Sequence, residues 1–108
     1  MKYTIKNNRV YNKDNEVAVI YSPHYGAGWS TWNTNHPSCL FDPDCVFCIL
    51  KGDRAELAVI AQLKWDDFYM TGNPIEIQWL PAGVKFRVLE YDGKESFQFY
   101  NDVDWVVA

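Results

Sequence analysis

Helix-boundary residues in the middle of the chain constrain its fold more than any other feature. In the segment FDPDCVFCILKG, Asp42 can cap a helix, Pro43 fits the first helical position and Gly52 can end the helix. The next segment is DRAELAVIAQLKW, where Asp53 followed by Glu56 resembles a capping box. Its apolar residues recur at helical spacing. The sequence therefore predicts two short helices joined by a sharp bend.

The segment before the helices predicts a β-hairpin. Val10 and Tyr11 lead into a polar turn at residues 12–15. Residues 17–21 are apolar on both faces, which favours a central strand that is covered on both sides. Pro23 is expected to end this strand.

The segment after the helices predicts an antiparallel meander. The segments that alternate between apolar and polar residues are 75–80, 84–91 and 95–100. The dipeptide Asp92-Gly93 is a strong signal for a tight hairpin, and a short final strand is expected over residues 104–107. We therefore predict a single α+β domain over residues 1–108, with an antiparallel sheet of about five or six strands covered by two short helices.

Composition and charge exclude several classes of protein. The chain has 108 residues, enough for one domain, and no apolar run approaches the 18 residues that a membrane span needs. The net charge is −4 and the cations are scattered, so generic nucleic-acid binding is not expected. The first residues lack the apolar stretch of a secretion signal, and three cysteines favour free thiols in a reducing compartment. The expected location is the cytoplasm.

An aromatic loop, SPHYGAGWSTWN at residues 22–33, is the strongest candidate for a ligand-binding surface. Its rings can stack on a nucleobase, and its glycines let backbone N–H groups approach an anion such as phosphate. The candidate ligand-binding residues are His24, Tyr25, Gly26, Gly28, Trp29, Ser30, Thr31, Trp32, Asn33 and Arg87. The alternatives are that Trp29 and Trp32 simply plug the bottom of the sheet, or that they form a contact surface for a protein.

Two other clusters carry candidate chemistry. The cluster of one histidine and three cysteines consists of His36, Cys39, Cys45 and Cys48, a set known in structural zinc sites. Core packing explains these cysteines better, because free cysteine behaves as a small hydrophobic residue, and we predict no metal and no cofactor. The acidic residues Glu90, Asp92 and Glu95 surround the predicted hairpin turn, where a charged, solvated tip is expected rather than a metal site.

The chain resembles a family of small uncharacterised proteins of bacteriophages and prophages. The similarity lies in VIYSPHYGAGWSTWN, LFDP, LPAGVKFRVLEYDGKESF and the closing DVDWVVA. It implies a phage accessory role in the host cytoplasm, with counter-defence as the expected setting. The three cysteine positions are ordinarily aliphatic in that family, which further disfavours zinc.

Several functions fit these observations. The first is a non-enzymatic counter-defence protein that sequesters a small nucleotide-derived signalling molecule, with the aromatic loop on the base and Arg87 on the phosphate. The second is an inhibitor that docks on a host defence protein through the loop. The third is a small nucleotide-processing enzyme in which His24, held by an oriented partner, acts as acid or base. A zinc-stabilised module is a fourth. The surplus of aromatic residues is also compatible with a homo-oligomer.

Overall fold

Two capped helices form where the sequence predicts them. The computed structural model describes residues 2–70 and 74–99, and it places helix α1 at Pro43–Lys51 and helix α2 at Arg54–Lys64. The side chains of Asp42 and Asp53 accept hydrogen bonds from backbone N–H groups in the first turn of each helix. Gly52 ends α1 in the left-handed conformation, with a φ of 76°, which makes the sharp bend.

Within residues 2–70 and 74–99, six strands form two antiparallel sheets. The strands are β1 (Thr4–Lys6), β2 (Arg9–Tyr11), β3 (Glu16–Tyr21), β4 (Glu76–Pro81), β5 (Phe86–Tyr91) and β6 (Lys94–Phe99). One sheet has the order β1-β2-β3-β4, and in the other β5 pairs with β6. The predicted α+β class and the number of strands are confirmed. The expected final strand at residues 104–107 lies outside the described residues.

The second half of the chain does not continue as one meander. β4 pairs with β3 over its whole length, from Glu16 opposite Pro81 to Tyr21 opposite Glu76. This pairing places β3 between two neighbours, as its apolar faces predict. After β4, Gly83 adopts a φ of 82° and the chain turns away, so β5 pairs with β6 instead. The predicted strands are therefore divided between two sheets.

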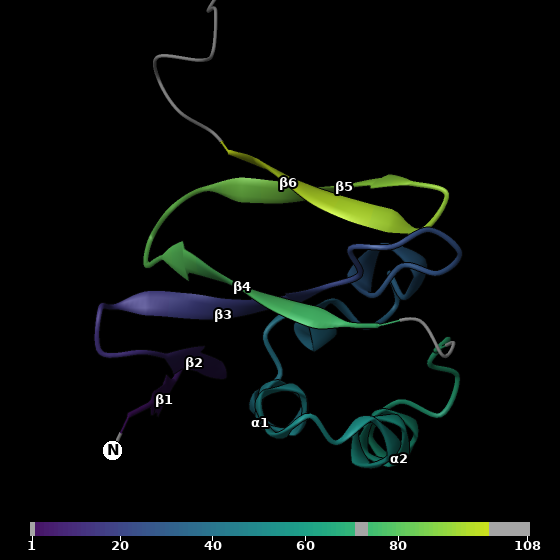
Figure 1. Cartoon of the computed structure of the whole chain (residues 1–108), viewed down its shortest axis with the longest axis horizontal. Helices are drawn as coiled ribbons and strands as arrows, with labels where there is room; N and C mark the ends of the chain where they lie inside the picture. Colours follow the sequence, from purple (N-terminus) through teal and green to yellow (C-terminus); the bar gives the residue numbers. More distant parts are fainter. Residues whose placement is uncertain (1, 71–73, 100–108) are drawn as a thin grey trace, which may run out of the picture.

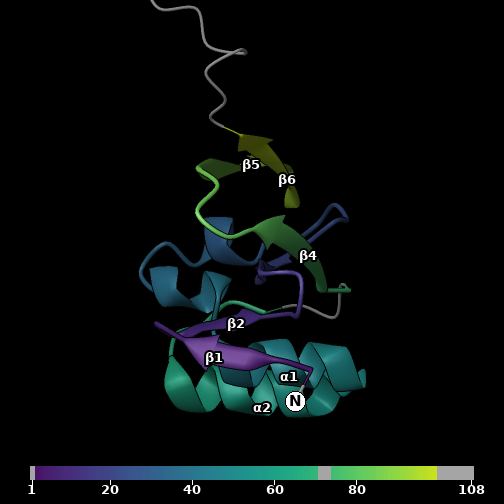
Figure 2. The same ribbon diagram turned by 90° about the vertical axis from the view of Figure 1, so that its left-hand side faces the viewer.

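The elements stack in three layers. The two helices lie on one side of the four-stranded sheet, and the β5–β6 hairpin lies on the other side (Figures 1 and 2). The aromatic loop leaves β3 and runs beside the β5–β6 turn, at the right of Figure 1. Two 3₁₀ helices, Ser30–Trp32 and Pro37–Leu40, then lead the chain to α1. The loop is thus placed between the hairpin and the rest of the domain.

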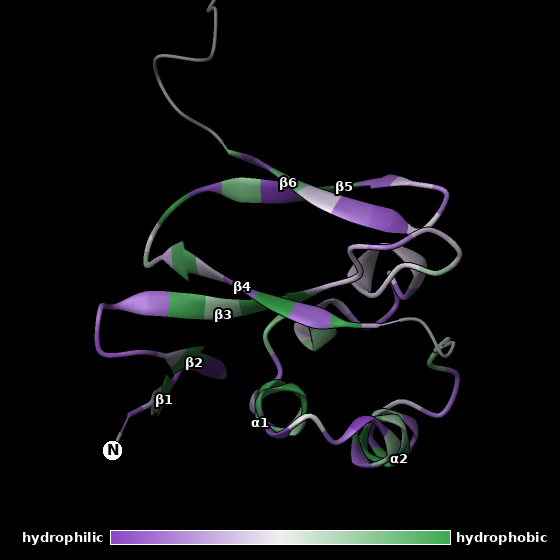
Figure 3. Ribbon diagram, in the orientation of Figure 1, coloured by the Kyte–Doolittle hydropathy of each residue, from purple (hydrophilic) through white to green (hydrophobic). Residues whose placement is uncertain are grey.

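The core lies between the four-stranded sheet and the helices. Hydrophobic stretches of β3 and α1 stand out in Figure 3, and both contribute fully buried side chains. The buried core cluster consists of Val10, Ala18, Ile20, Trp29, Cys39, Cys45, Val46, Cys48, Leu57, Ala61 and Phe68. Trp29 brings the aromatic loop into this cluster through an edge-to-face contact with Phe68, with ring centroids 4.7 Å apart. No helix among the described residues is long and apolar enough to span a membrane.

Candidate functional site

A buried carboxylate holds the aromatic loop in place. Glu95, near the start of β6, is only 2% exposed. Its Oε1 accepts a hydrogen bond from the Ser22 backbone N–H at 2.8 Å. Its Oε2 accepts bonds from the backbone N–H groups of Trp29 (2.9 Å) and Thr31 (3.0 Å) and from the Thr31 hydroxyl (2.6 Å). The loop therefore binds an anion, as its glycine-rich sequence suggests, but that anion is a side chain of the protein itself.

The expectation of a fully solvated acidic hairpin tip is wrong for Glu95. Its backbone N–H donates to the carbonyl of Ser22, so the start of β6 lies directly beside the end of β3 and its side chain points into the loop. Asp92 and Glu90 remain exposed. The Glu90 carboxylate accepts bonds from the Gly93 N–H (2.7 Å) and the Trp32 indole N–H (3.1 Å), which lower its pKa.

The loop and the β5–β6 turn touch through their backbones. The N–H of Gly26 donates to the carbonyl of Asp92 at 2.7 Å. Gly93 has a φ of 87°, and a Cβ atom there would lie 2.4 Å from the backbone nitrogen of Ala27. Only glycine fits this position without displacing the loop. The turn and the loop thus form one rigid unit.

Three of the predicted ligand-binding residues are buried, namely Gly28, Trp29 and Asn33, and the side chains of Trp29 and Asn33 serve the fold. Trp29 is 1% exposed, and its indole N–H donates to the carbonyl of Cys39 at 2.7 Å. The Asn33 side chain donates to the carbonyls of Trp29 and Tyr69 and accepts from the Tyr69 N–H. Neither side chain offers a free face to a ligand. Of the two tryptophans, Trp29 plugs the core and Trp32 does not.

Four exposed rings form two contacting pairs on the aromatic loop and its neighbouring segments, and we call them the aromatic patch. They are Tyr25 (56% exposed), Trp32 (36%), Tyr69 (49%) and Tyr91 (76%). Tyr25 contacts Tyr91 edge-on at 6.3 Å, and Trp32 contacts Tyr69 at 5.5 Å between ring centroids. The two tyrosines outside the loop, Tyr69 and Tyr91, are not among the residues predicted from the sequence. The Asp-Gly turn next to Tyr91 was an available signal, because a residue beside a tight turn at a strand end is readily exposed.

The remaining predicted residues do not converge on one point. Arg87 lies on the face of β5 opposite to Glu90, and its Nε donates to the Gln98 side chain across the hairpin. His24 is exposed, and no described residue forms a hydrogen bond with its ring. Ser30 is half-buried, and Gly28 is packed tightly against the Thr31 and Trp32 side chains. The aromatic rings, the loop amides and Arg87 therefore do not form one pocket.

The cysteines are separate, buried thiols. Within residues 2–70 and 74–99 there is no group of three or more His, Cys, Asp or Glu side chains placed to hold a metal ion. Burial, reinforced by the charges of Glu95 and Asp42, raises the pKa of Cys39 to about 12. Burial also raises the pKa of Cys45 and of Cys48. His36 instead pairs with Asp67 and packs against the Trp65 ring.

The raised thiol pKa values predict a loss of stability in alkali. Unfolding returns the Cys39 pKa from about 12 to about 9, so between these values the unfolded state holds fewer protons than the native state. The contribution of the protonated thiol to the free energy of unfolding is therefore fully present below pH 9. It falls as the pH rises, by up to about 1.4 kcal/mol per pH unit for each such thiol. Urea unfolding between about pH 7 and pH 10.5 measures this slope.

The control for this prediction is Cys39→Ala. This variant is less stable at every pH because it leaves a cavity, but its alkaline slope should be shallower than that of the original chain. Equal slopes in the two proteins would show that Cys39 does not contribute.

Two cavities lie away from the aromatic patch. One, of about 200 Å³, is lined by residues from the N-terminal segment, the β2–β3 turn and β4. The other, of about 180 Å³, lies between the α1–α2 bend and Met70, Pro74 and Ile75, and is mostly apolar. No ring of the aromatic patch lines either cavity. Both cavities are therefore separate from the patch.

Comparisons of the chain with protein-family models, with curated proteins and with solved structures found no significant match.

Proposed function

We propose that this chain is a binding protein that docks, through its aromatic patch, on a protein with a basic surface. The observation that carries the proposal is the exposure of four aromatic rings on and beside a loop that Glu95 and Gly93 hold rigid. Aromatic side chains with this exposure are the typical anchors of protein interfaces. Because the loop is already ordered, little conformational entropy is lost on docking.

The charges next to the patch favour a basic partner. Glu90, which accepts a bond from the Trp32 indole, and Asp92, in the turn itself, are both exposed carboxylates. Lys94 is the cation beside them, with its ammonium 5.3 Å from the centre of the Tyr25 ring. The net charge of the chain is −4. Arginine and lysine side chains around an apolar recess would complement this arrangement.

The same geometry disfavours the aromatic loop as a nucleotide site. The amides of Trp29 and Thr31 already donate to Glu95, and the exposed carboxylates of Glu90 and Asp92 would repel a phosphate. Because the chain resembles small phage proteins, we extend the proposal to a biological context. In that context the partner is a host defence protein, which the chain inhibits by binding to it.

Paired variants test the docking surface. Trp32→Ala combined with Tyr91→Ala removes two exposed rings, so we expect the fold to be kept and a specific partner to bind at least about tenfold more weakly. The measurement is affinity capture from a bacterial lysate, followed by biolayer interferometry with the purified partner. Binding of a basic partner should also weaken as the salt concentration rises.

The matched control is Val59→Ala combined with Leu63→Ala. These side chains are exposed apolar residues on α2, 57% and 78% exposed, and neither belongs to the aromatic patch. The control variant should bind the partner as the original chain does. A protein retained equally by both variants, or no specific protein at all, would contradict the proposal.

A further inference from the structure

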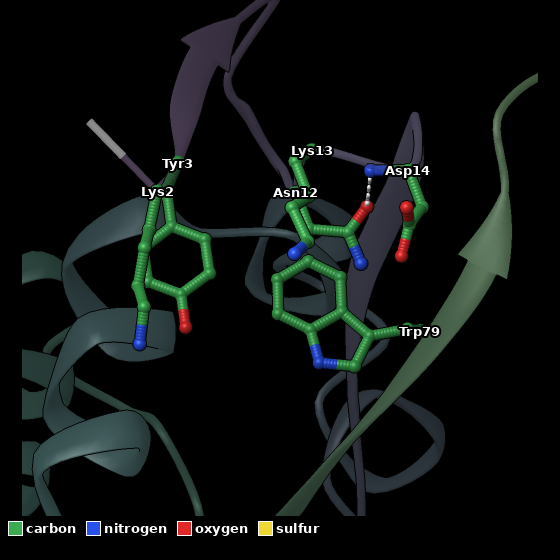
Figure 4. A pocket seen from close by; sticks show the side chains of 6 residues that line it. All are labelled: Lys2, Tyr3, Asn12, Lys13, Asp14 and Trp79. Atoms are coloured by element: carbon green, nitrogen blue, oxygen red, sulfur yellow. Dashed lines mark hydrogen bonds between the residues drawn. The ribbon is translucent and has the colours of Figure 1, made fainter.

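The cavity of about 200 Å³ differs from the aromatic patch in the charge of the residues around it. It lies beside the N-terminal segment, under the β2–β3 turn and against β4 (Figure 4). Its lining residues are Lys2, Tyr3, Asn12, Lys13, Asp14 and Trp79. A dry cavity of about 150 Å³ can hold a benzene molecule, so this cavity has room for one planar ring.

Aromatic side chains form the wall of the cavity. The rings of Tyr3 and Trp79 are nearly parallel, with an angle of 5° and centroids 5.8 Å apart. Phe47 on α1 packs edge-on against Tyr3 at 6.0 Å, and Trp79 is fixed in β4 opposite Ala18. The wall is therefore in place before any ligand arrives. A flat π surface of this kind suits stacking with a planar ring.

Cations stand at the mouth of the cavity. Lys2 and Lys13 are both exposed, and in Figure 4 the Lys13 side chain extends from the β2–β3 turn towards the Trp79 ring. Among the described residues that line the cavity, Asp14 is the one acidic residue, so these side chains carry a net charge of +1 in a chain of net charge −4. The described lining is therefore more basic than the chain as a whole, which favours an anion at the mouth.

The Asn12 amide shapes the cavity but is not free to bind a ligand. Its Oδ1 accepts bonds from the N–H groups of Asp14 (3.0 Å) and Glu16 (2.9 Å). Its Nδ2 donates to the Glu16 carboxylate at 2.9 Å. These bonds hold the β2–β3 turn, and with it Lys13, in one conformation.

We propose that this cavity binds a small anion that carries a planar ring, of the class of nucleoside monophosphates. The base stacks on the Tyr3–Trp79 wall, and the phosphate lies at the open mouth beside Lys2 and Lys13. Asp14 is placed to accept a hydrogen bond from an amino group on the ring. The site is independent of the aromatic patch, and each can fail without the other.

Calorimetric titration at low salt with three probes tests this site. The probes are AMP, adenosine and inorganic phosphate, which separate the ring from the charge. AMP should bind at least about fivefold more tightly than adenosine, and phosphate should bind most weakly of the three. Saturation-transfer NMR should show stronger transfer to the protons of the base than to those of the ribose. Benzoate, a ring with a carboxylate, distinguishes an aromatic acid from a nucleotide as the source of the same chemistry.

Two charge reversals locate the binding. Lys13→Glu should weaken AMP binding by about fivefold or more, because it replaces an attractive charge at the mouth with a repulsive one. Lys85→Glu, at an exposed position between β4 and β5, makes the same change outside the cavity and should alter the affinity by less than about twofold. Both side chains are exposed, so both variants should fold.

Three outcomes would overturn the proposal. They are the absence of binding of AMP and benzoate at about 5 mM, equal affinities for AMP and adenosine, and undiminished AMP binding by Lys13→Glu.

Discussion

Replacing Glu95 with alanine is expected to lower the free energy of unfolding by about 3–5 kcal/mol. The substitution removes the acceptor of four hydrogen bonds and leaves the N–H groups of Ser22, Trp29 and Thr31 without it. An unsatisfied buried donor costs about 1–3 kcal/mol, and part of this cost is relieved when water enters the loop. Urea unfolding followed by circular dichroism measures the change.

Two further variants define the cause of this loss. Glu76→Ala removes an exposed carboxylate from β4 and should change the stability by less than about 0.5 kcal/mol. Glu95→Gln keeps the shape but turns an N–H₂ group towards one set of donors, so it should be destabilising by an intermediate amount. A loss below about 1 kcal/mol in Glu95→Ala would show that the carboxylate does not hold the loop.

Replacing Gly93 with alanine is expected to cost about 3 kcal/mol or more. The new methyl group would lie 2.4 Å from the backbone nitrogen of Ala27 and 2.9 Å from its Cα and carbonyl carbon. The φ of 87° adds the strain of the left-handed region, about 1 kcal/mol. Because the obstacle is backbone, the loop itself must move. The same urea experiment measures the effect.

Gly83→Ala is the matched control for this substitution. Gly83 has nearly the same φ, 82°, but no atom lies within 4 Å of the position of its added Cβ. It should therefore show only the backbone strain, about 1 kcal/mol. The difference between the two variants isolates the contact between the turn and the loop. Equal losses would mean that the two backbones do not touch in solution.

The parts of the fold that the sequence predicts are those that depend on neighbouring residues. Asp42 and Asp53 cap helices whose first turns they precede, and Gly52 ends a helix that it directly follows. The tight turn at residues 92–93 is equally local. The first strand was missed although its signal is also local, since Asn7 and Asn8 form a left-handed turn between β1 and β2.

The candidate site could be predicted only in part, because its contacts join distant residues. Glu95 meets the Ser22 N–H across 73 positions of the sequence, and no local pattern distinguishes it from Glu90, which is exposed. The glycine-rich sequence of the loop indicated an anion-binding site. It did not indicate that the anion would be the side chain of Glu95. Similarly, Trp79 and Tyr3 are 76 residues apart in the chain, so their shared cavity follows from the strand order β1-β2-β3-β4 of the whole sheet.

The long separation between Glu95 and the loop also sets an order of events during synthesis. A ribosome releases the loop, with Tyr25, Trp29 and Trp32, well before it adds the carboxylate that those backbone amides require. Until the hairpin follows, the loop has no partner for its N–H groups and its rings have no fixed arrangement. A nascent chain that ends before β6 would thus display the aromatic residues without the surface that they form in the folded protein.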